Sequence, residues 1–220
     1  GLHVVGNYAY VAGLNEGLSV VDISDPLNPV EVGSLVDDAI LALDGAFGVR
    51  VEGNNAYVTS VTDNAFTVID ISDPTNPFEA GTLRDTDDPL AELTGARRLE
   101  IVGNYAYVAA QSDSGVSVID ISDPTNPFLA GAIADDGITA LAGATGIDVV
   151  GNLAYVASAV DDGISILDIT DPTNPFEVGN IIDDGTTSLD GAYGIRVVGN
   201  YAYVATLLED ALSIIDVSDP

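Results

Sequence analysis

The sequence contains no cysteine, methionine or tryptophan, and there is no lysine among its five basic residues. The absence of cysteine excludes disulfides and thiolate metal sites. No apolar stretch approaches the roughly 20 residues of a membrane-spanning helix, so we expect no insertion into a membrane. Because His3 is the single histidine, a Cys–His catalytic pair is excluded and a Ser–His–Asp triad would depend on that residue.

Positive charge is scarce throughout the chain. Five arginines stand against 35 acidic residues, which gives a formal net charge of −30. Such a chain repels phosphate backbones and anionic membrane surfaces, so we expect no binding to nucleic acid. The sequence also lacks the G-x-S-x-G, phosphate-loop and H-E-x-x-H motifs, and it therefore offers little sign of catalysis.

The remaining composition is that of a folded domain. The chain has 220 residues, of which 47% are hydrophobic, and its mean hydropathy is +0.31. This length is enough for one large all-β domain with its own core. The first residue already lies inside a repeat and is not methionine, so we expect a processed or partial chain.

A repeat of 47 to 50 residues runs through the whole sequence. The motif G-N-x-A-Y-V recurs five times, and an Asp-Pro pair follows each copy at the same spacing. The motifs begin at Gly6, Gly53, Gly103, Gly151 and Gly199, and the pairs at Asp25, Asp73, Asp123, Asp171 and Asp219. A period of this length is typical of propeller blades with four strands each.

Each repeat reads as four short strands rich in Val, Ile and Tyr and bounded by Gly, Asn, Asp and Pro. The pattern predicts one all-β domain over residues 1–220, a β-propeller of about five four-stranded blades. The expected blades are 1–47, 48–97, 98–145, 146–193 and 194–220. The last blade lacks its outer strand.

The segment DISDPTNPF occurs at 70–78 and again at 120–128. Asp and Asn in such a segment accept hydrogen bonds from nearby backbone N–H groups, and Pro removes a donor, so we expect a turn between the third and fourth strands. Metal binding by the repeated aspartates is the alternative. The core YVA…SVIDISDPTNP resembles the LVIVD-repeat family of bacterial and archaeal propellers. That resemblance implies an extracellular or surface-associated protein, often part of a very large chain, and few such proteins have a defined activity.

Acidic residues gather on one predicted face of the propeller. Seven lie in the loops between second and third strands, Glu16 among them, and twelve lie in the crossings between blades, so this rim holds 19 of the 35 carboxylates. A solvated surface is one explanation, and weak Ca²⁺ binding is the other. The best single cluster for a cation is Asp85, Asp87 and Asp88. We expect Arg84, Arg97 and Arg98 to pair with these aspartates.

One variable position recurs in the innermost strand of every blade. Its residues are His3, Arg50, Glu100, Asp148 and Arg196. If they line the channel, we expect them to form salt bridges around the axis, and a small-ligand site at the channel mouth is the alternative.

The end of the chain predicts an open sheet edge, because the fifth blade stops after its third strand. The expected assembly edge is Ala211, Leu212, Ser213, Ile214, Ile215, Asp216, Val217 and Ser218. An unpaired edge templates pairing with another chain. Either a longer form of the chain supplies the missing strand, or a neighbouring molecule pairs at this edge. We expect other protein chains as partners, and self-association through this edge.

Together these features favour a non-catalytic extracellular or cell-surface module with a structural or adhesive role, able to assemble into a surface layer or filament. The alternative function is that of a Ca²⁺-dependent propeller hydrolase resembling a lactonase, with the metal in the central channel. The arrangement of the channel side chains discriminates between them. Carboxylates that converge on one point favour the hydrolase, and arginine–carboxylate pairs favour the structural module.

Overall fold

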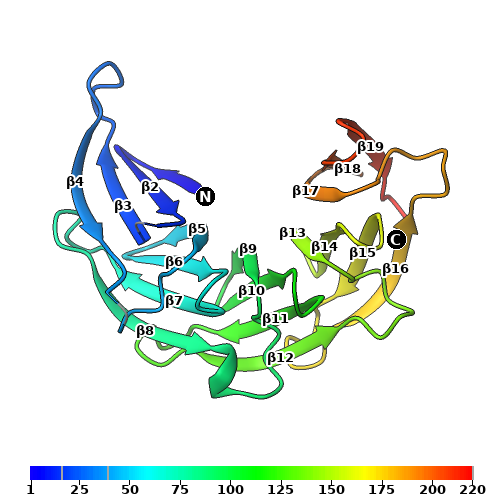
Figure 1. The fold of residues 1–220 in the computed structure, drawn as a ribbon, viewed down its shortest axis with the longest axis horizontal. Helices are drawn as coiled ribbons and strands as arrows, with labels where there is room; N and C mark the ends of the chain where they lie inside the picture. Colours follow the sequence, from blue (N-terminus) through cyan, green and yellow to red (C-terminus); the bar gives the residue numbers. More distant parts are fainter. Residues whose placement is uncertain (16, 39, 220) are drawn as a thin grey trace.

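The structure, a computed structural model, describes residues 1–15, 17–38 and 40–219, and its strands form five antiparallel sheets (Figure 1). Blade 1 contains β1 (Leu2–Val5), β2 (Tyr8–Gly13), β3 (Gly17–Asp22) and β4 (Val30–Leu35). Blade 2 contains β5 (Ala46–Glu52), β6 (Asn55–Ser60), β7 (Ala65–Asp70) and β8 (Phe78–Arg84). Blade 3 contains β9 (Ala96–Val102), β10 (Tyr105–Ala110), β11 (Gly115–Asp120) and β12 (Phe128–Ala134). Blade 4 contains β13 (Ala144–Val150), β14 (Leu153–Ser158), β15 (Gly163–Asp168) and β16 (Phe176–Ile182). Blade 5 contains β17 (Ala192–Val198), β18 (Tyr201–Thr206) and β19 (Leu212–Asp216).

The predicted all-β propeller is confirmed, including the three-stranded fifth blade. In the described part of the chain the one helical element is a short 3-10 turn, η1 (Asp85–Asp87). No helix there is long and apolar enough to cross a membrane. The inner strands of blades 2 to 5 begin two residues before the expected blade boundaries. The reason is a β-bulge, seen in blade 2 where Ala46 pairs with Ser60 and Gly48 with Thr59, which leaves one extra residue between them.

The five blades form an open row. Each inner strand contacts the next one along the chain, from β1 to β5, β9, β13 and β17. Blades 1 and 5 stand at the two ends of the arc, and each turns one face of its sheet away from the rest of the row (Figure 1).

Apolar side chains between neighbouring blades form the core, as four separate clusters. In the first cluster, Tyr10 and Val20 of blade 1 pack against Val49 and Val58 of blade 2. The crossing between these blades adds Leu43, which is fully buried. The equivalent leucines of the later crossings are Leu93, Leu141 and Leu189. Each acidic crossing therefore contributes a buried leucine to the core.

The turn between the first and second strands has glycine at a positive φ, for example 58° at Gly6 and 59° at Gly53. Val5 pairs with Tyr8, so Gly6 and Asn7 form a two-residue hairpin loop. Glycine is favoured at the first loop position of such a turn because it tolerates positive φ without a steric cost.

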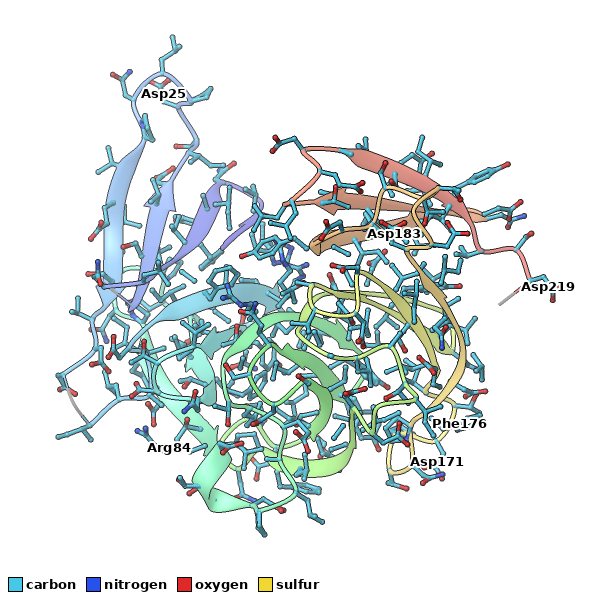
Figure 2. All side chains as sticks on the ribbon, turned by 45° about the vertical axis from the view of Figure 1, so that its right-hand side comes forward. Asp25, Arg84, Asp171, Phe176, Asp183 and Asp219 are labelled. Atoms are coloured by element: carbon cyan, nitrogen blue, oxygen red, sulfur yellow. The ribbon has the colours of Figure 1, made fainter. Side chains whose placement is uncertain are left out.

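The repeated DISDPTNP segment is a hydrogen-bonded turn, as predicted. Asp70 Oδ1 accepts from the backbone N–H of Ser72 at 2.8 Å, and Asp73 Oδ1 accepts from that of Thr75 at 3.0 Å. Asp25 and Asp171, in the equivalent turns, lie at the outer tips of their blades (Figure 2). The turn also touches the preceding blade. A Cβ atom on Gly33 or Gly81 would lie 2.2 or 2.6 Å from a proline carbonyl oxygen of the next blade's turn, so only glycine fits there.

Candidate functional site

The five variable inner-strand residues are brought together around the axis. His3, Arg50, Glu100 and Arg196 line one hollow of about 550 Å³, with Glu52 at its edge. Each lies three residues before the Gly-Asn turn that ends its strand, and the inner strands contact one another in chain order. The position that varies most between the inner strands therefore faces a shared space.

Within this hollow both arginines are paired with carboxylates. The guanidinium of Arg50 binds both carboxylate oxygens of Glu100, with Nε 3.0 Å from Oε2. Arg196 Nη1 lies 2.7 Å from Oδ1 of the buried Asp148, whose Oδ2 accepts the backbone N–H of Val197 at 2.6 Å. The hydrogen bonds to Glu100 raise the pKa of Arg50 above its ordinary value. These contacts make the site a set of arginine–carboxylate pairs.

His3 completes the channel lining as a neutral side chain. Its Nδ1 accepts the backbone N–H of Val51 at 2.7 Å. Burial, followed by the nearby Arg50 charge, lowers the pKa of His3 below its ordinary value of 6.5. An acceptor nitrogen and a lowered pKa both favour the uncharged imidazole.

The three aspartates proposed as a cation site do not converge. Asp85 accepts hydrogen bonds from Leu93 N and Thr94 Oγ1, Asp87 accepts from Arg84 N, and Asp88 accepts from Leu90 N. Among the residues that the structure describes, no group of three or more His, Asp or Glu side chains is arranged to hold a metal ion. The prediction of a cluster is wrong in this geometry, because each carboxylate caps a different backbone group of the loop.

Several acids of the rim serve the fold in the same way. The backbone N–H of the crossing donates to Asp63 at 2.8 Å in blade 2, to Asp113 at 2.6 Å in blade 3 and to Asp161 at 2.8 Å in blade 4. Glu16, which the sequence also placed on this rim, lies outside the described residues. The loops between second and third strands differ in sequence, but the acid at this position accepts a backbone hydrogen bond from the crossing in each of these blades.

The expected pairing of Arg84, Arg97 and Arg98 with the aspartate cluster is wrong. Arg84 Nη2 donates to the carbonyl of Ile40 at 3.0 Å, and the residue lies at the periphery of the row (Figure 2). In the described chain neither Arg97 nor Arg98 forms an ion pair with a carboxylate. Both lie instead against the ring of Tyr193 on β17, because the bulge in β9 turns them toward the axis.

The predicted assembly edge contains β19, the outermost strand of its sheet. β19 pairs with β18 on one side, and within the described residues no strand pairs with its other side. Ala211 and Val217 flank the strand and bond to blade 5 itself, through Thr206 and Asn200. Ser213 Oγ donates to the carbonyl of Ser188 at 2.5 Å. The remaining edge residues are Leu212, Ile214, Ile215, Asp216 and Ser218.

More apolar surface is exposed on the faces of the end blades than the sequence suggested. Ile214 is 60% exposed, whereas the equivalent residues of blades 1 to 4 are between 0 and 3% exposed. Leu2 of blade 1 is also 60% exposed, and its equivalents in blades 2 to 4 are between 1 and 3% exposed. We call the first surface the C-terminal face (Leu212, Ile214, Tyr201) and the second the N-terminal face (Leu2, Val4). They are the two halves of the interface that joins neighbouring blades.

The sequence model of the LVIVD repeat matches residues 1–37, 45–85, 95–135, 143–183 and 191–220, so the match covers most of the chain. The chain belongs to the LVIVD-repeat family. Its five matched segments coincide with the five blades, and each begins one residue or less before the inner strand of its blade. None of the curated protein sequences compared with this LVIVD-repeat chain matches it.

Solved propeller structures resemble the LVIVD-repeat chain in fold. A protein from Bacteroides uniformis, provisionally assigned as a 6-phosphogluconolactonase, aligns with a TM-score of 0.74 at 16% identity, over 98% of this chain and 65% of that one. The β-propeller domain of Cps50 (Swd1) from Myceliophteria thermophila aligns with a TM-score of 0.70 at 12% identity, over 96% and 67%. BamB from Moraxella catarrhalis aligns with a TM-score of 0.67 at 13% identity, over 99% and 57%. The chain thus spans about three fifths to two thirds of their lengths, and these identities show the shared fold alone.

Aligning the repeats of the LVIVD chain with one another reveals residues that motif searching missed. Arg98 stands where the other four blades have glycine, and Gln111 stands where they have an apolar residue. In the structure Gln111 binds Arg97, the residue beside Arg98. The signal was present in the sequence, as a polar residue at positions where the other copies agree on a different type.

Proposed function

We propose that this LVIVD-repeat protein is a non-catalytic structural or adhesive module of the extracellular space or cell surface, which associates with other protein chains through the ends of its blade row. The observation that carries the proposal is the exposure of the N-terminal and C-terminal faces. In every interior position the same faces are buried against a neighbouring blade.

The chemistry of these faces supports a blade of a second copy as the partner. The C-terminal face presents Leu212 and Ile214 in the positions that Leu18 and Val20 occupy in the interface between blades 1 and 2. The N-terminal face presents Leu2 in the position of Val49 on the opposite side of that interface. The two faces are different and complementary, so association is head to tail and generates a ring or an open fibre. The free side of β19 adds unpaired backbone groups at the same end.

The channel supports a non-catalytic role over the alternative of a Ca²⁺-dependent lactonase-like hydrolase. Glu100 and Asp148, the carboxylates of the inner strands at this level, each bind an arginine and do not face one another as a metal-binding pair. The hydrolase alternative is tested by measuring lactone hydrolysis with and without added Ca²⁺. We expect no turnover in either condition, and Ca²⁺-dependent turnover would contradict the proposal.

The placement outside the cell rests on the family and on composition. The extreme acidic charge and the absence of lysine suit a surface that stays hydrated in salty or crowded surroundings. Detection of the protein on intact cells with an antibody, before and after protease treatment of the cell surface, checks this part of the proposal.

The association itself is tested on the 220-residue chain by light scattering coupled to size-exclusion chromatography across a range of concentrations. We expect the mass to rise with concentration, and we expect Ile214→Glu to remain monomeric because a charge in the interface would be buried without a partner. Ile138→Glu is the matched control, since Ile138 is also strongly exposed but lies in a crossing. A wild-type chain that stays monomeric at every concentration, or equal behaviour of the two variants, would contradict assembly through this face.

A further inference from the structure

Blade 3 departs from the repeat at the mouth of the channel, on the side of the acidic rim. The third residue of its inner strand is Arg98, preceded by Arg97. The other blades have glycine at the position of Arg98, as Gly48, Gly146 and Gly194. The loop after β10 begins with Gln111, whose equivalents are Leu14, Val61, Ala159 and Leu207. These blades otherwise repeat closely. The replacement of glycine and an apolar residue by Arg98 and Gln111, both next to Arg97, therefore indicates a function in addition to stabilising the fold.

The bulge in β9 brings both arginines to the same aromatic ring. Arg98 pairs with Ala109 and Ala96 with Ala110, so Arg97 is the extra residue of the bulge. Their Cζ atoms lie 5.8 Å (Arg97) and 5.5 Å (Arg98) from the centroid of the Tyr193 ring. The ring of Phe47 lies 5.0 Å from the Cζ atom of Arg97. Residues from three inner strands, β5, β9 and β17, thus converge at the mouth.

Arg97 is held rigidly while most of its hydrogen-bonding capacity stays unused. Its Nε donates to Gln111 Oε1 at 2.6 Å, and its Nη1 donates to the hydroxyl of Tyr193 at 3.2 Å. A guanidinium carries five N–H donors, so three remain. Arg98 is exposed, and within the described residues its guanidinium makes the contact with Tyr193 and no hydrogen bond.

The charge at the mouth differs from the charge deeper in the channel. There Arg50 and Arg196 are each paired with a carboxylate, whereas Arg97 and Arg98 keep two positive charges without a carboxylate partner in the described chain. Beside Arg98 lies a cavity of about 180 Å³, lined also by Gly1, Leu2, Phe47, Gly48, Val49, Arg50 and Leu99. A chain with a net charge of −30 therefore places two neighbouring cations without a carboxylate partner at the mouth, and one of them, Arg98, lines a small cavity.

We propose that the mouth of the channel binds a small oxyanion, the carboxylate or phosphate group of a small molecule, through Arg97 and Arg98. Planar guanidinium groups bind carboxylate and phosphate oxygens through paired N–H donors, and the pre-ordered Arg97 loses little conformational freedom on binding. Phe47 and Leu99 offer apolar contact to the rest of the ligand. The net charge of the protein excludes polyanions such as nucleic acids from this site. The cavity shares Leu2 with the N-terminal face, so binding is measured at concentrations where the chain is monomeric.

The test uses the small number of arginines. In a ¹⁵N-labelled chain the arginine Nε–H region contains five side-chain resonances, which single substitutions assign. Inorganic phosphate and succinate are titrated separately at pH 7.5, with NaCl adjusted to hold ionic strength constant. We expect the Arg97 and Arg98 resonances to shift and saturate with a dissociation constant of about 1 mM. Saturation by phosphate alone or by succinate alone identifies which oxyanion the site takes, and either supports the proposal.

Each variant introduces the residue that another blade has at the equivalent position. This choice limits the risk that the variant unfolds. Arg98→Gly introduces the residue of blades 2, 4 and 5, and we expect it to weaken binding about tenfold, as loss of a charge-assisted hydrogen bond implies. Arg84→Ala introduces the residue that blade 3 has at Ala134 and changes the net charge equally, and we expect it to bind as the wild type does. Non-saturating shifts of all five resonances, no shift at all, or equal affinities of the two variants would overturn the proposal.

Discussion

Glycine at the third position of the inner strand has different steric surroundings in different blades. A Cβ atom on Gly48 would lie 2.4 Å from the carbonyl oxygen of Arg97 in the next blade. A Cβ atom on Gly194 would meet its nearest neighbour, Ala205 Cβ, at 3.9 Å. The same residue type is thus required inside the row and is unconstrained at its C-terminal face.

We therefore expect Gly48→Ala to lower the free energy of unfolding by about 1–3 kcal/mol, the usual cost of forcing an atom into a packed site. Gly194→Ala, at the equivalent position, should change it by less than about 0.5 kcal/mol, as for an open surface site. Urea denaturation of both variants under conditions where the chain is monomeric measures the difference. Equal destabilisation would mean that Gly194 is also packed against another blade.

Glu92 gives the stability a dependence on pH. Burial, with the nearby charges of Asp113 and Asp85, raises the pKa of Glu92 to about 7, above its ordinary value of 4.5. Between these two values the folded state binds more protons than the unfolded state, so stability falls as the pH rises from about 4.5 to 7 and then levels off.

Glu92→Gln should remove the fall in stability that the charged Glu92 causes as the pH rises. We expect the variant and the wild type to have similar unfolding free energies below about pH 4.5 and the variant to be the more stable at pH 8, where the wild-type carboxylate is charged. Urea denaturation at both pH values measures the gain. Glu52→Gln removes one acid elsewhere, and a gain of the same size in that variant would mean that net charge alone is responsible.

At the scale of strands and blades, the structure could be predicted from the sequence wherever the same residue pattern recurs in each repeat. Alternation of Val, Ile and Tyr with Gly, Asn, Asp and Pro at the boundaries predicted each strand, and the fixed period predicted each blade. The bulge at the start of the inner strands was missed, because a bulge adds one residue without changing the composition of the strand.

The channel position was predicted correctly as a set of residues at one register, and its partners follow from opposite charges on neighbouring strands. The contact partners of Arg97 and Arg98 could not be predicted in the same way. Proximity in sequence favoured the aspartates of the preceding crossing, but the bulge directs both side chains toward aromatic rings about 50 and 95 residues away in the chain. Such long-range partners depend on how the blades are placed relative to one another.

At the scale of the whole molecule, charge is the dominant feature. A net charge of −30 on a compact chain opposes folding through mutual repulsion, although many rim carboxylates accept hydrogen bonds from their own loops. Several turn aspartates, Asp70 and Asp73 among them, have a pKa lowered by hydrogen bonds from the side chains and backbone of Ser72 and Thr75. Stability that depends on these groups is present above the ordinary pKa and is lost as the pH falls through the lowered one.

Screening should therefore stabilise the protein. We expect the melting temperature to rise between low salt and 0.5 M NaCl, by about 2–4 °C for each kcal/mol gained in a chain of this size. Because the aspartates of the rim do not converge, millimolar Ca²⁺ and Mg²⁺ at fixed ionic strength should have equal effects. A larger rise with Ca²⁺ in a thermal melt would restore the Ca²⁺-binding explanation of the rim, and substitution of Asp85, Asp87 or Asp88 would then locate the site.

The contact between each turn and the preceding blade has a consequence for how such a gene changes over generations. Gly33, Gly81 and Gly131 lie against backbone carbonyl oxygens of the following turn, and Gly33 and Gly81 also lie against a proline ring of that turn, so these joints require glycine on one side and the repeated turn on the other. The turns of blades 1 to 4 share the pattern D-P-x-N-P, so we expect this joint to form between any two of them. Residues 70–78 and 120–128 are identical, so an exchange between the coding segments for them would add or delete one blade length and leave the other joints unchanged. The number of blades can therefore change by one at a time between related proteins, while the sequence of each blade stays the same.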